Sequence, residues 1–181
     1  MSDTIGKALR SVVSFLEEAG YDYMVIGGFA LPFYGMIRTT IDIDFAISLE
    51  SSTTFDTFRS LTEDAGFKLT IGSFKDPVCI FLERDTGLEI EFWTRPDGIE
   101  WDEETLARRR KRLLYDVEAW IISPEDFVVN KLARPDRGVQ DERDVKSVLA
   151  RLRDDLDGEY LERRATNAGV WAILRTINEV A

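Results

Sequence analysis

The sequence predicts an α+β or α/β protein with a helical C-terminal part. In the first two thirds of the chain, apolar runs of strand length alternate with stretches of helical period. Turn residues separate the later strand-like runs. Beyond Ser123 only helical patterns remain. These observations indicate an α/β core over residues 1–122 and a helical region over residues 123–181 that packs on it.

The helices are predicted from apolar side chains that recur every three or four residues and from residues that start or stop a helix. Gly20 ends the first helix, Gly35 closes a short one, and Ser51 begins a run of capping side chains. Ser123 and Pro124 form a strong helix start, with a capping residue followed by proline at the first helical position. The expected helices cover residues 4–18, 29–34, 51–66, 124–131, 141–152 and 159–180.

The strands are predicted from short apolar runs between turns. Within residues 40–47, Ile41, Ile43 and Phe45 share one face, and Asp42 and Asp44 share the other, because side chains alternate along a strand. The expected strands cover residues 23–26, 40–47, 68–71, 78–83, 88–93, 111–115 and 118–121.

Length and composition exclude several classes of protein. A chain of 181 residues has room for one domain, with or without a small helical appendage. No apolar run approaches the ~20 residues of a membrane span. The start of the chain also lacks the basic, apolar and small-residue regions of a signal peptide. We therefore expect a cytoplasmic protein with no membrane contact.

The absence of histidine narrows the possible chemistry. It excludes Ser–His and Cys–His nucleophiles, imidazole bases and His-ligated zinc, and Cys79 alone cannot form a disulfide or a cysteine zinc site. Catalysis would have to use carboxylates, Lys, Arg and metal ions. Hard oxygen ligands favour Mg²⁺ or Mn²⁺.

The charge balance is acidic, with a net charge of −11 that opposes binding along nucleic acid. Residues 108–112 are an exception, since all five are Arg or Lys. This run fits either a solvated basic edge or a landing patch for an anionic substrate or partner.

Two motifs about fifteen residues apart carry the chemical information. Gly27 and Gly28 follow a predicted strand, and glycines at such a turn leave backbone N–H groups open to an anion. We expect the helix that follows to point its positive end the same way. Asp42 and Asp44 would stand ~6–7 Å apart on one face of a strand, where a divalent cation would relieve their repulsion. Together the motifs indicate a site for a metal-bound triphosphate.

The run GGFALPFYGMIRTTIDIDFAI, residues 27–47, resembles the signature of the nucleotidyltransferase superfamily, in which a Gly-Gly or Gly-Ser turn precedes an Asp-x-Asp on the next strand. It is most similar to minimal nucleotidyltransferases, including toxins of abortive-infection and toxin–antitoxin systems. The run SPEDFVVNKLARPDRGVQDERDV, residues 123–145, resembles their helical segment. The resemblance spans roughly residues 23–152 and implies the polymerase-beta-like nucleotidyltransferase fold. This is an α+β fold in which helices flank a mixed sheet, here with a helical C-terminal part.

The resemblance also implies roles for particular residues. Asp42, Asp44 and a third acid on a later strand would bind metal and catalyse transfer. Glu91 is preferred as the third acid because apolar residues follow it directly, and Glu89 stays open as an alternative. The family usually has aspartate there. The residues implied to bind the nucleotide are Gly27, Gly28, Arg38, Thr39, Lys131 and Asp141.

The implied function is metal-dependent transfer of a nucleoside monophosphate from a nucleoside triphosphate to a hydroxyl group. The acceptor could be a tRNA, a protein or a small molecule, and a toxin role would bring a cognate antitoxin as partner. Glutamate as third acid, and Gln140 where the family has lysine, also fit an alternative, a decayed nucleotide-binding or partner-binding protein on the same fold.

Overall fold

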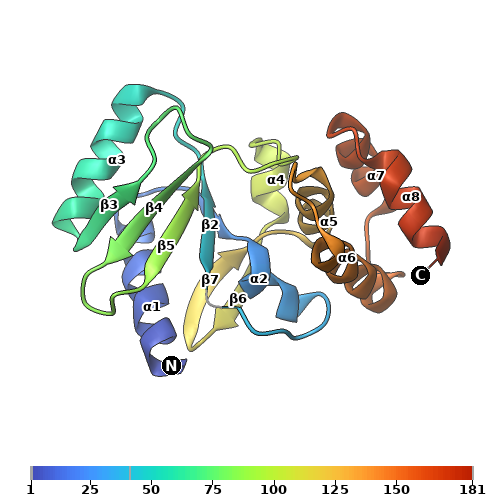
Figure 1. The fold of residues 1–181 in the computed structure, drawn as a ribbon, viewed down its shortest axis with the longest axis horizontal. Coiled ribbons are helices and arrows are strands. Elements are labelled where there is room, and N and C mark those ends of the chain that lie inside the picture. Colours follow the sequence, from blue (N-terminus) through green and yellow to red (C-terminus); the bar gives the residue numbers. More distant parts are fainter. Residues whose placement is uncertain (1, 41, 181) are drawn as a thin grey trace. The chain divides into compact units, whose positions relative to one another are not determined.

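The computed structural model describes residues 2–40 and 42–180 (Figure 1). The chain forms two compact units, each assembled from separate stretches of sequence. A sheet unit contains residues 2–25, 42–95 and 110–121, and a helical unit contains residues 26–40, 96–109 and 122–180. The predicted core, residues 1–122, includes residues 26–40 and 96–109, which the structure groups with the C-terminal helices. The division of the chain into domains at 1–122 and 123–181 stays a prediction.

The sheet unit is built on seven strands in the order β3-β4-β5-β2-β1-β7-β6 (Figure 1). Strand β2 runs antiparallel to β1 and parallel to β5, and β1 runs parallel to β7. The sheet is therefore mixed, and the predicted α+β class is confirmed. The strands are β1 Tyr23–Val25, β2 Ile43–Ile47, β3 Phe67–Ile71, β4 Val78–Glu83, β5 Glu89–Trp93, β6 Arg110–Leu114 and β7 Val117–Ile121.

Helices α1 (Ser2–Glu18) and α3 (Ser52–Asp64) cover one face of the sheet. The Phe58 ring of α3 lies 5.9 Å from that of Phe15 in α1 and 5.2 Å from that of Phe92 in β5. This aromatic core is buried because large rings remove much apolar surface from water. Ser51 caps α3, since its side chain accepts a hydrogen bond from Thr54 N, as predicted.

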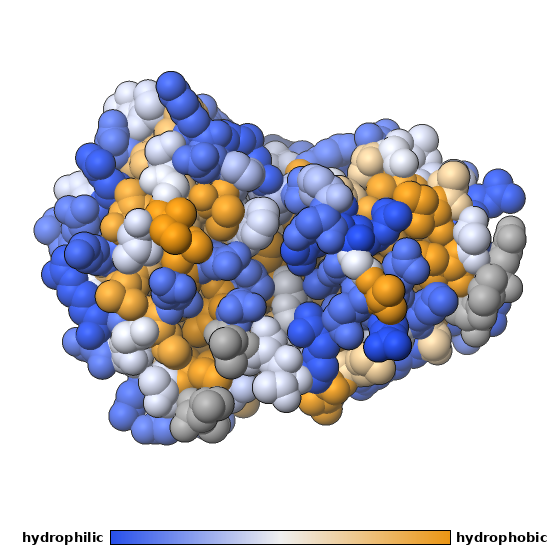
Figure 2. Space-filling model, viewed as in Figure 1, coloured by the Kyte–Doolittle hydropathy of each residue, from blue (hydrophilic) through white to orange (hydrophobic). Residues whose placement is uncertain are grey.

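The opposite face of the sheet is less covered. Val78, Ile80 and Leu82 alternate along β4 with buried residues and are only half-buried. Figure 2 shows hydrophobic residues gathered over β3, β4 and β5 in the left part of the view. Ile80 pairs with Glu91 of β5, so the acidic side chains of β5 lie on this less covered face.

The helical unit is centred on α5, in which Pro124 to Leu132 are all buried. The Ser123 hydroxyl accepts a hydrogen bond from Asp126 N at 3.0 Å, which confirms the predicted helix start. Tyr160 of α7 donates to the Asp126 carboxylate at 2.9 Å. The elements of this unit are α2 Gly27–Ala30, the 3₁₀ helix η1 Leu31–Phe33, α4 Glu103–Arg108, α5 Pro124–Ala133, α6 Val139–Leu152, α7 Gly158–Asn167 and α8 Trp171–Val180.

Helix α4 was not expected from the sequence. Its start is marked by Asp102, which accepts a hydrogen bond from Thr105 N at 2.8 Å. The helix is tied to α7 by Arg164, whose guanidinium is buried and pairs with Glu100 and Asp102. A short polar helix of this kind depends on tertiary ion pairs and shows little apolar period.

Three predictions about elements need correction. The single helix over 159–180 is wrong, because Gly169 at φ 72° ends α7 and α8 begins at Trp171. The helix over 29–34 is one α-turn followed by η1. The strand predicted over 40–47 begins at Ile43, so Asp42 precedes it, and Ile41 lies outside the described residues.

No helix in the described part of the chain combines the length and apolar character that a membrane crossing requires.

Candidate active site

The acid cluster of the sheet unit consists of Asp42, Asp44, Glu91 and Trp93. Asp44 in β2 and Glu91 in β5 are paired in register on adjacent parallel strands, so their side chains leave the sheet on the same face. Glu91 acts on the Asp44 carboxyl through its charge and through hydrogen bonding. The Trp93 indole N–H donates to Glu91 Oε2 at 3.1 Å.

The environment of Asp44 favours its protonated form. Burial raises the pKa of the Asp44 carboxyl to about 7, with further contributions from the charge and hydrogen bond of Glu91 and from the charge of Asp42. The Trp93 hydrogen bond opposes this shift. Two acids this close cannot both ionise in water-poor surroundings without a counterion, so near neutral pH the pair holds a proton.

Glu91, rather than Glu89, is the strand acid that acts on Asp44. Glu91 is half-buried and level with Asp44, whereas Glu89 is exposed at the start of β5. Asp42, one residue before β2, is exposed but contributes to the Asp44 pKa through its charge.

The donor set of the acid cluster fits a hard divalent cation. It offers only carboxylate oxygens, the ligands that Mg²⁺ and Mn²⁺ prefer. Burial is the main cause of the raised pKa of Asp44, and the charges of Glu91 and Asp42 raise it further. A bound cation would neutralise that negative charge. Within residues 2–40 and 42–180, no group of three or more His, Cys, Asp or Glu side chains is already arranged to hold a metal ion. Asp42 would have to turn toward the other two acids.

The glycine turn, Gly27 and Gly28, belongs to the helical unit. Gly27 has φ 63°, a conformation that strains residues with a side chain. A Cβ on Gly28 would lie 2.8 Å from the Thr40 side chain, so only glycine fits there. Helix α2 is a single turn, and the expected support from a following helix is correspondingly small. The backbone of the turn is thus the feature that could meet an anion.

A second polar group in the helical unit is the Lys131 cluster, made of Arg38, Lys131, Gln140, Asp141 and Asp144. Lys131 is a buried residue of α5. Its Nζ lies 3.0 Å from Asp141 Oδ1 and 3.4 Å from Asp144 Oδ2. Both acids lie on α6, three residues apart and therefore on one side of that helix.

The other members of the Lys131 cluster converge on Asp144, which is fully buried. Arg38 donates to it through Nε and Nη2, each at 3.3 Å, and Gln140 donates through Nε2 at 2.8 Å. Thr39 is exposed, and its carbonyl oxygen accepts a hydrogen bond from Arg38 at 3.5 Å.

Asp141 also caps α6 by accepting a hydrogen bond from Gly138 N at 3.0 Å. Burial would raise its pKa, but the Gly138 hydrogen bond and the Lys131 ion pair hold that pKa below its usual value. Asp141 therefore stays ionised at neutral pH and forms an ion pair with Lys131.

The predicted site residues thus fall into two groups within the described chain. Asp42, Asp44 and Glu91 form the acid cluster of the sheet unit, and Arg38, Lys131 and Asp141 meet in the helical unit, which also holds the glycine turn and Thr39. Sequence reasoning missed Trp93 as a hydrogen-bond donor to Glu91. Its position two residues after Glu91, on the same strand face, was the available signal. The central role of Asp144 depends on the packing of α5 against α6.

The mixed sheet, with acids on adjacent parallel strands and helices on one face, defines the nucleotidyltransferase fold, and solved structures of that fold match the chain. The chain belongs to the family described as "Nucleotidyl transferase of unknown function (DUF2204)", whose model matches residues 6–168. It is an enzyme of the nucleotidyltransferase type. No curated protein matches the chain in sequence.

Among solved structures, the solution structure of the antibiotic-resistance factor ANT(2″)-Ia has a TM-score of 0.62 and 14% identity, and the match covers 100% of both chains. The same protein in complex with adenylyl-2″-tobramycin has a TM-score of 0.56 and 13% identity, over 91% of this chain and 97% of that one. The lincosamide antibiotic adenylyltransferase LnuA, bound to lincomycin, has a TM-score of 0.53 and 15% identity, over 78% and 94%. At these identities the likeness is one of fold.

Proposed function

We propose that this protein transfers a nucleoside monophosphate from a nucleoside triphosphate to a hydroxyl group, with Mg²⁺ or Mn²⁺ bound at Asp42, Asp44 and Glu91. One observation carries the proposal. Asp44 and Glu91 meet in register on parallel strands, and burial, followed by the charge of Glu91, raises the pKa of Asp44 to about 7. The unfavourable concentration of negative charge is what a divalent cation would relieve.

In this proposal the acid cluster has two tasks. A divalent cation held there supplies charge neutralisation and Lewis-acid activation of phosphate oxygens. Glu91 accepts the proton of the attacking hydroxyl, for which the carboxylate must be ionised. Trp93, which donates a hydrogen bond to Glu91 at 3.1 Å, orients this carboxylate. The hydroxyl attacks the α-phosphorus and pyrophosphate leaves.

The helical unit would bind the triphosphate. We assign the backbone N–H groups of Gly27 and Gly28, together with Arg38, Thr39 and Lys131, to the phosphates. An ammonium group has three donors, and two of those on Lys131 face Asp141 and Asp144, so the third can serve a phosphate. Asp141 would hold the Lys131 ammonium group in place through their ion pair.

For the acceptor we propose a small, hydroxyl-bearing and preferably cationic molecule. The net charge of −11 favours a cation and disfavours RNA. The solved neighbours support this choice, since one is bound to an adenylylated tobramycin and another to lincomycin. A tRNA or protein acceptor, with a toxin role and a cognate antitoxin, is the second candidate and rests on the motif resemblance. Either activity would take place in the cytoplasm.

The first test is calorimetric titration of the four nucleoside triphosphates with Mg²⁺ and with Mn²⁺. We expect metal-dependent binding of at least one nucleotide by the wild type and its loss in Asp42→Asn plus Asp44→Asn. Asp85→Asn is the matched control, because Asp85 is an exposed aspartate in the β4–β5 turn. Equal binding by the double variant would refute the assignment of the acid cluster.

The second test uses the bound nucleotide, labelled on its α-phosphate, with three acceptor pools: aminoglycosides and lincosamides, total tRNA, and cell protein. Label in the small-molecule pool, absent with Asp44→Asn, would support the proposed acceptor. Label in tRNA or protein would replace it with the toxin candidate. Nucleotide binding without transfer to water or to any pool would contradict the proposed reaction.

A further inference from the structure

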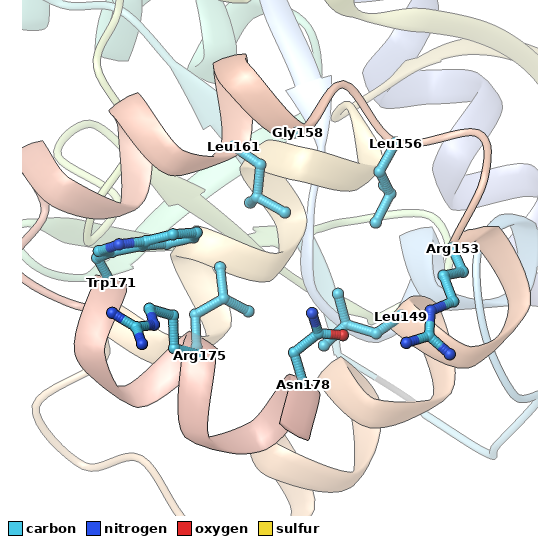
Figure 3. A pocket seen from close by; sticks show the side chains of 9 residues that line it. Leu149, Arg153, Leu156, Gly158, Leu161, Trp171, Arg175 and Asn178 are labelled. Atoms are coloured by element: carbon cyan, nitrogen blue, oxygen red, sulfur yellow. The ribbon is translucent and has the colours of Figure 1, made fainter. Parts of the chain in front are cut away.

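A cavity of about 170 Å³ lies among the last three helices of the helical unit (Figure 3). Leu149 comes from α6, Leu161 from α7 and Trp171 from α8. In Figure 3 the Trp171 ring enters the space from one side, and Leu149 lies across from it. Among the described residues that line the cavity, none belongs to the acid cluster or to the Lys131 cluster.

The size of the cavity selects a small apolar group. An apolar protein cavity of ~150 Å³ is large enough to hold a benzene molecule. The space here is of the same order, so it accepts one six-membered ring. The flat indole of Trp171 offers a surface on which such a ring can stack.

The polar rim selects the charge of that group. Arg153, the residue at the C-terminal end of α6, and Arg175 of α8 both line the cavity, and Asn178 of α8 adds an amide. In Figure 3 the Arg153 side chain lies on the side of the cavity next to Leu149, with Asn178 between it and Trp171. A guanidinium and an amide beside an apolar space suit a carboxylate attached to a ring.

The positive charge at the rim of the cavity is opposite in sign to the net charge of the protein. The chain carries 34 acidic and 23 basic residues, and its general field repels anions. An anion would therefore be drawn to the cavity only by the arginines at its rim. Burial of the ring would supply the rest of the binding free energy.

We propose that this cavity is a binding site for a small aryl carboxylate, separate from the candidate active site. The ring occupies the space between Leu149, Leu161 and Trp171, and the carboxylate pairs with Arg153. The proposal does not depend on the proposed function, because neither nucleotide nor metal is needed for it.

The probe is phenylacetate, with phenylacetamide as the neutral molecule of the same shape. The readout is the indole N–H resonance of Trp171 in a ¹⁵N–¹H spectrum of the full chain, assigned by its loss in Trp171→Phe. We expect saturable shifts with phenylacetate at a dissociation constant of about 0.1–1 mM, the range for a ligand of this size. The dissociation constant of phenylacetamide should be at least about tenfold higher than that of phenylacetate.

Two variants test the parts of the site. Arg153→Gln should weaken phenylacetate binding about tenfold and leave phenylacetamide unchanged, since it removes a charge-assisted bond. Arg143→Gln, which makes the same charge change at an exposed position of α6 away from the cavity, should have no effect.

Three results would overturn the proposal. One is the absence of any Trp171 shift with 10 mM phenylacetate (~10-fold above the weakest expected affinity). Another is equal affinity for phenylacetate and phenylacetamide, which would mark an apolar packing gap without charge selection. The last is an equal effect of Arg153→Gln and Arg143→Gln, which would assign the affinity to general charge.

Discussion

Asp44 and Glu91 make the stability of the metal-free protein depend on pH. The pKa of Asp44 is raised to about 7, first by burial and then by Glu91, while in the unfolded chain it returns to its usual value near 4. The folded state therefore binds an additional proton between these values. Stability is full below pH 4 for this group and is lost as the pH rises through about 7.

We predict that Glu91→Gln reduces this loss. Without the Glu91 charge, the pKa of Asp44 falls, and the decrease in unfolding free energy from pH 5 to pH 8 should shrink by on the order of 1 kcal/mol. Urea unfolding with a chelator present measures it. Asp126, whose pKa burial raises to about 6, titrates in both proteins and cancels in the comparison. An identical pH dependence would show that the two carboxyls do not share a proton.

Lys131 is a cation that contacts both buried acids of α6. Its side chain is 4% exposed, and that of Asp144 is 0% exposed. We predict that Lys131→Met lowers the unfolding free energy by about 3 kcal/mol at pH 7, because buried carboxylates lose their compensating charge.

Lys146→Met is the matched control for this variant, since Lys146 is an exposed residue of α6. It should change stability by less than about 0.5 kcal/mol. Urea denaturation compares the two. Similar midpoints would mean that Arg38 and Gln140 are sufficient to compensate Asp144.

Helices α7 and α8 are separated by a glycine whose conformation other residues avoid. Gly169 has φ 72°, and its N–H and that of Val170 close the end of α7 on Thr166 O and Ala165 O. We predict that Gly169→Ala lowers the free energy of unfolding by about 1 kcal/mol, because a side chain is strained at this φ. Steric contact is not the cause, since a Cβ there would meet no described atom within 4 Å.

Gly158→Ala, at the start of α7, is the control for Gly169→Ala. The space around Gly158 is equally open, and its backbone is in an ordinary region. This change should stabilise the protein by about 0.4–1 kcal/mol by reducing the freedom of the unfolded chain. Thermal unfolding of both variants measures the two changes in stability. Equal changes would contradict the explanation that the positive φ at Gly169 strains a residue with a side chain.

The protein as a whole should be stabilised by its substrate. If Mg²⁺ and a nucleoside triphosphate bind only the folded state, a concentration 100 times the dissociation constant adds about 2.7 kcal/mol. For a chain of this length that raises the melting temperature by about 5–10 °C. Differential scanning fluorimetry with each triphosphate measures the shift.

This shift should require both metal and the acid cluster. We expect it to vanish in a chelator and in Asp42→Asn plus Asp44→Asn, and to persist in Asp85→Asn. A full shift in the double variant would mean that the nucleotide binds without the acid cluster.

Local patterns were sufficient for most elements of the fold. Strand 78–83 matches β4, and Ser123 with Pro124 marks the start of α5, because alternation and capping are encoded within a few residues. The Gly-Gly and Asp-x-Asp motifs likewise indicated the fold through their spacing along the chain. The end of α7 was missed although Gly169 was visible, because an isolated glycine is also tolerated inside a helix.

The tertiary structure determined the strand register, the burial of charged residues and the long-range ion pairs, which local sequence patterns do not specify. The sheet register brings Asp44 to Glu91 rather than to Glu89, although the two glutamates share a strand face and a similar sequence context. The packing of α5 on α6 buries Lys131 beside Asp141 and Asp144. Helix α4 depends on Arg164, more than fifty residues away along the chain. Register, burial and long-range ion pairs depend on which distant segments meet, and side-chain periodicity carries no information about that choice.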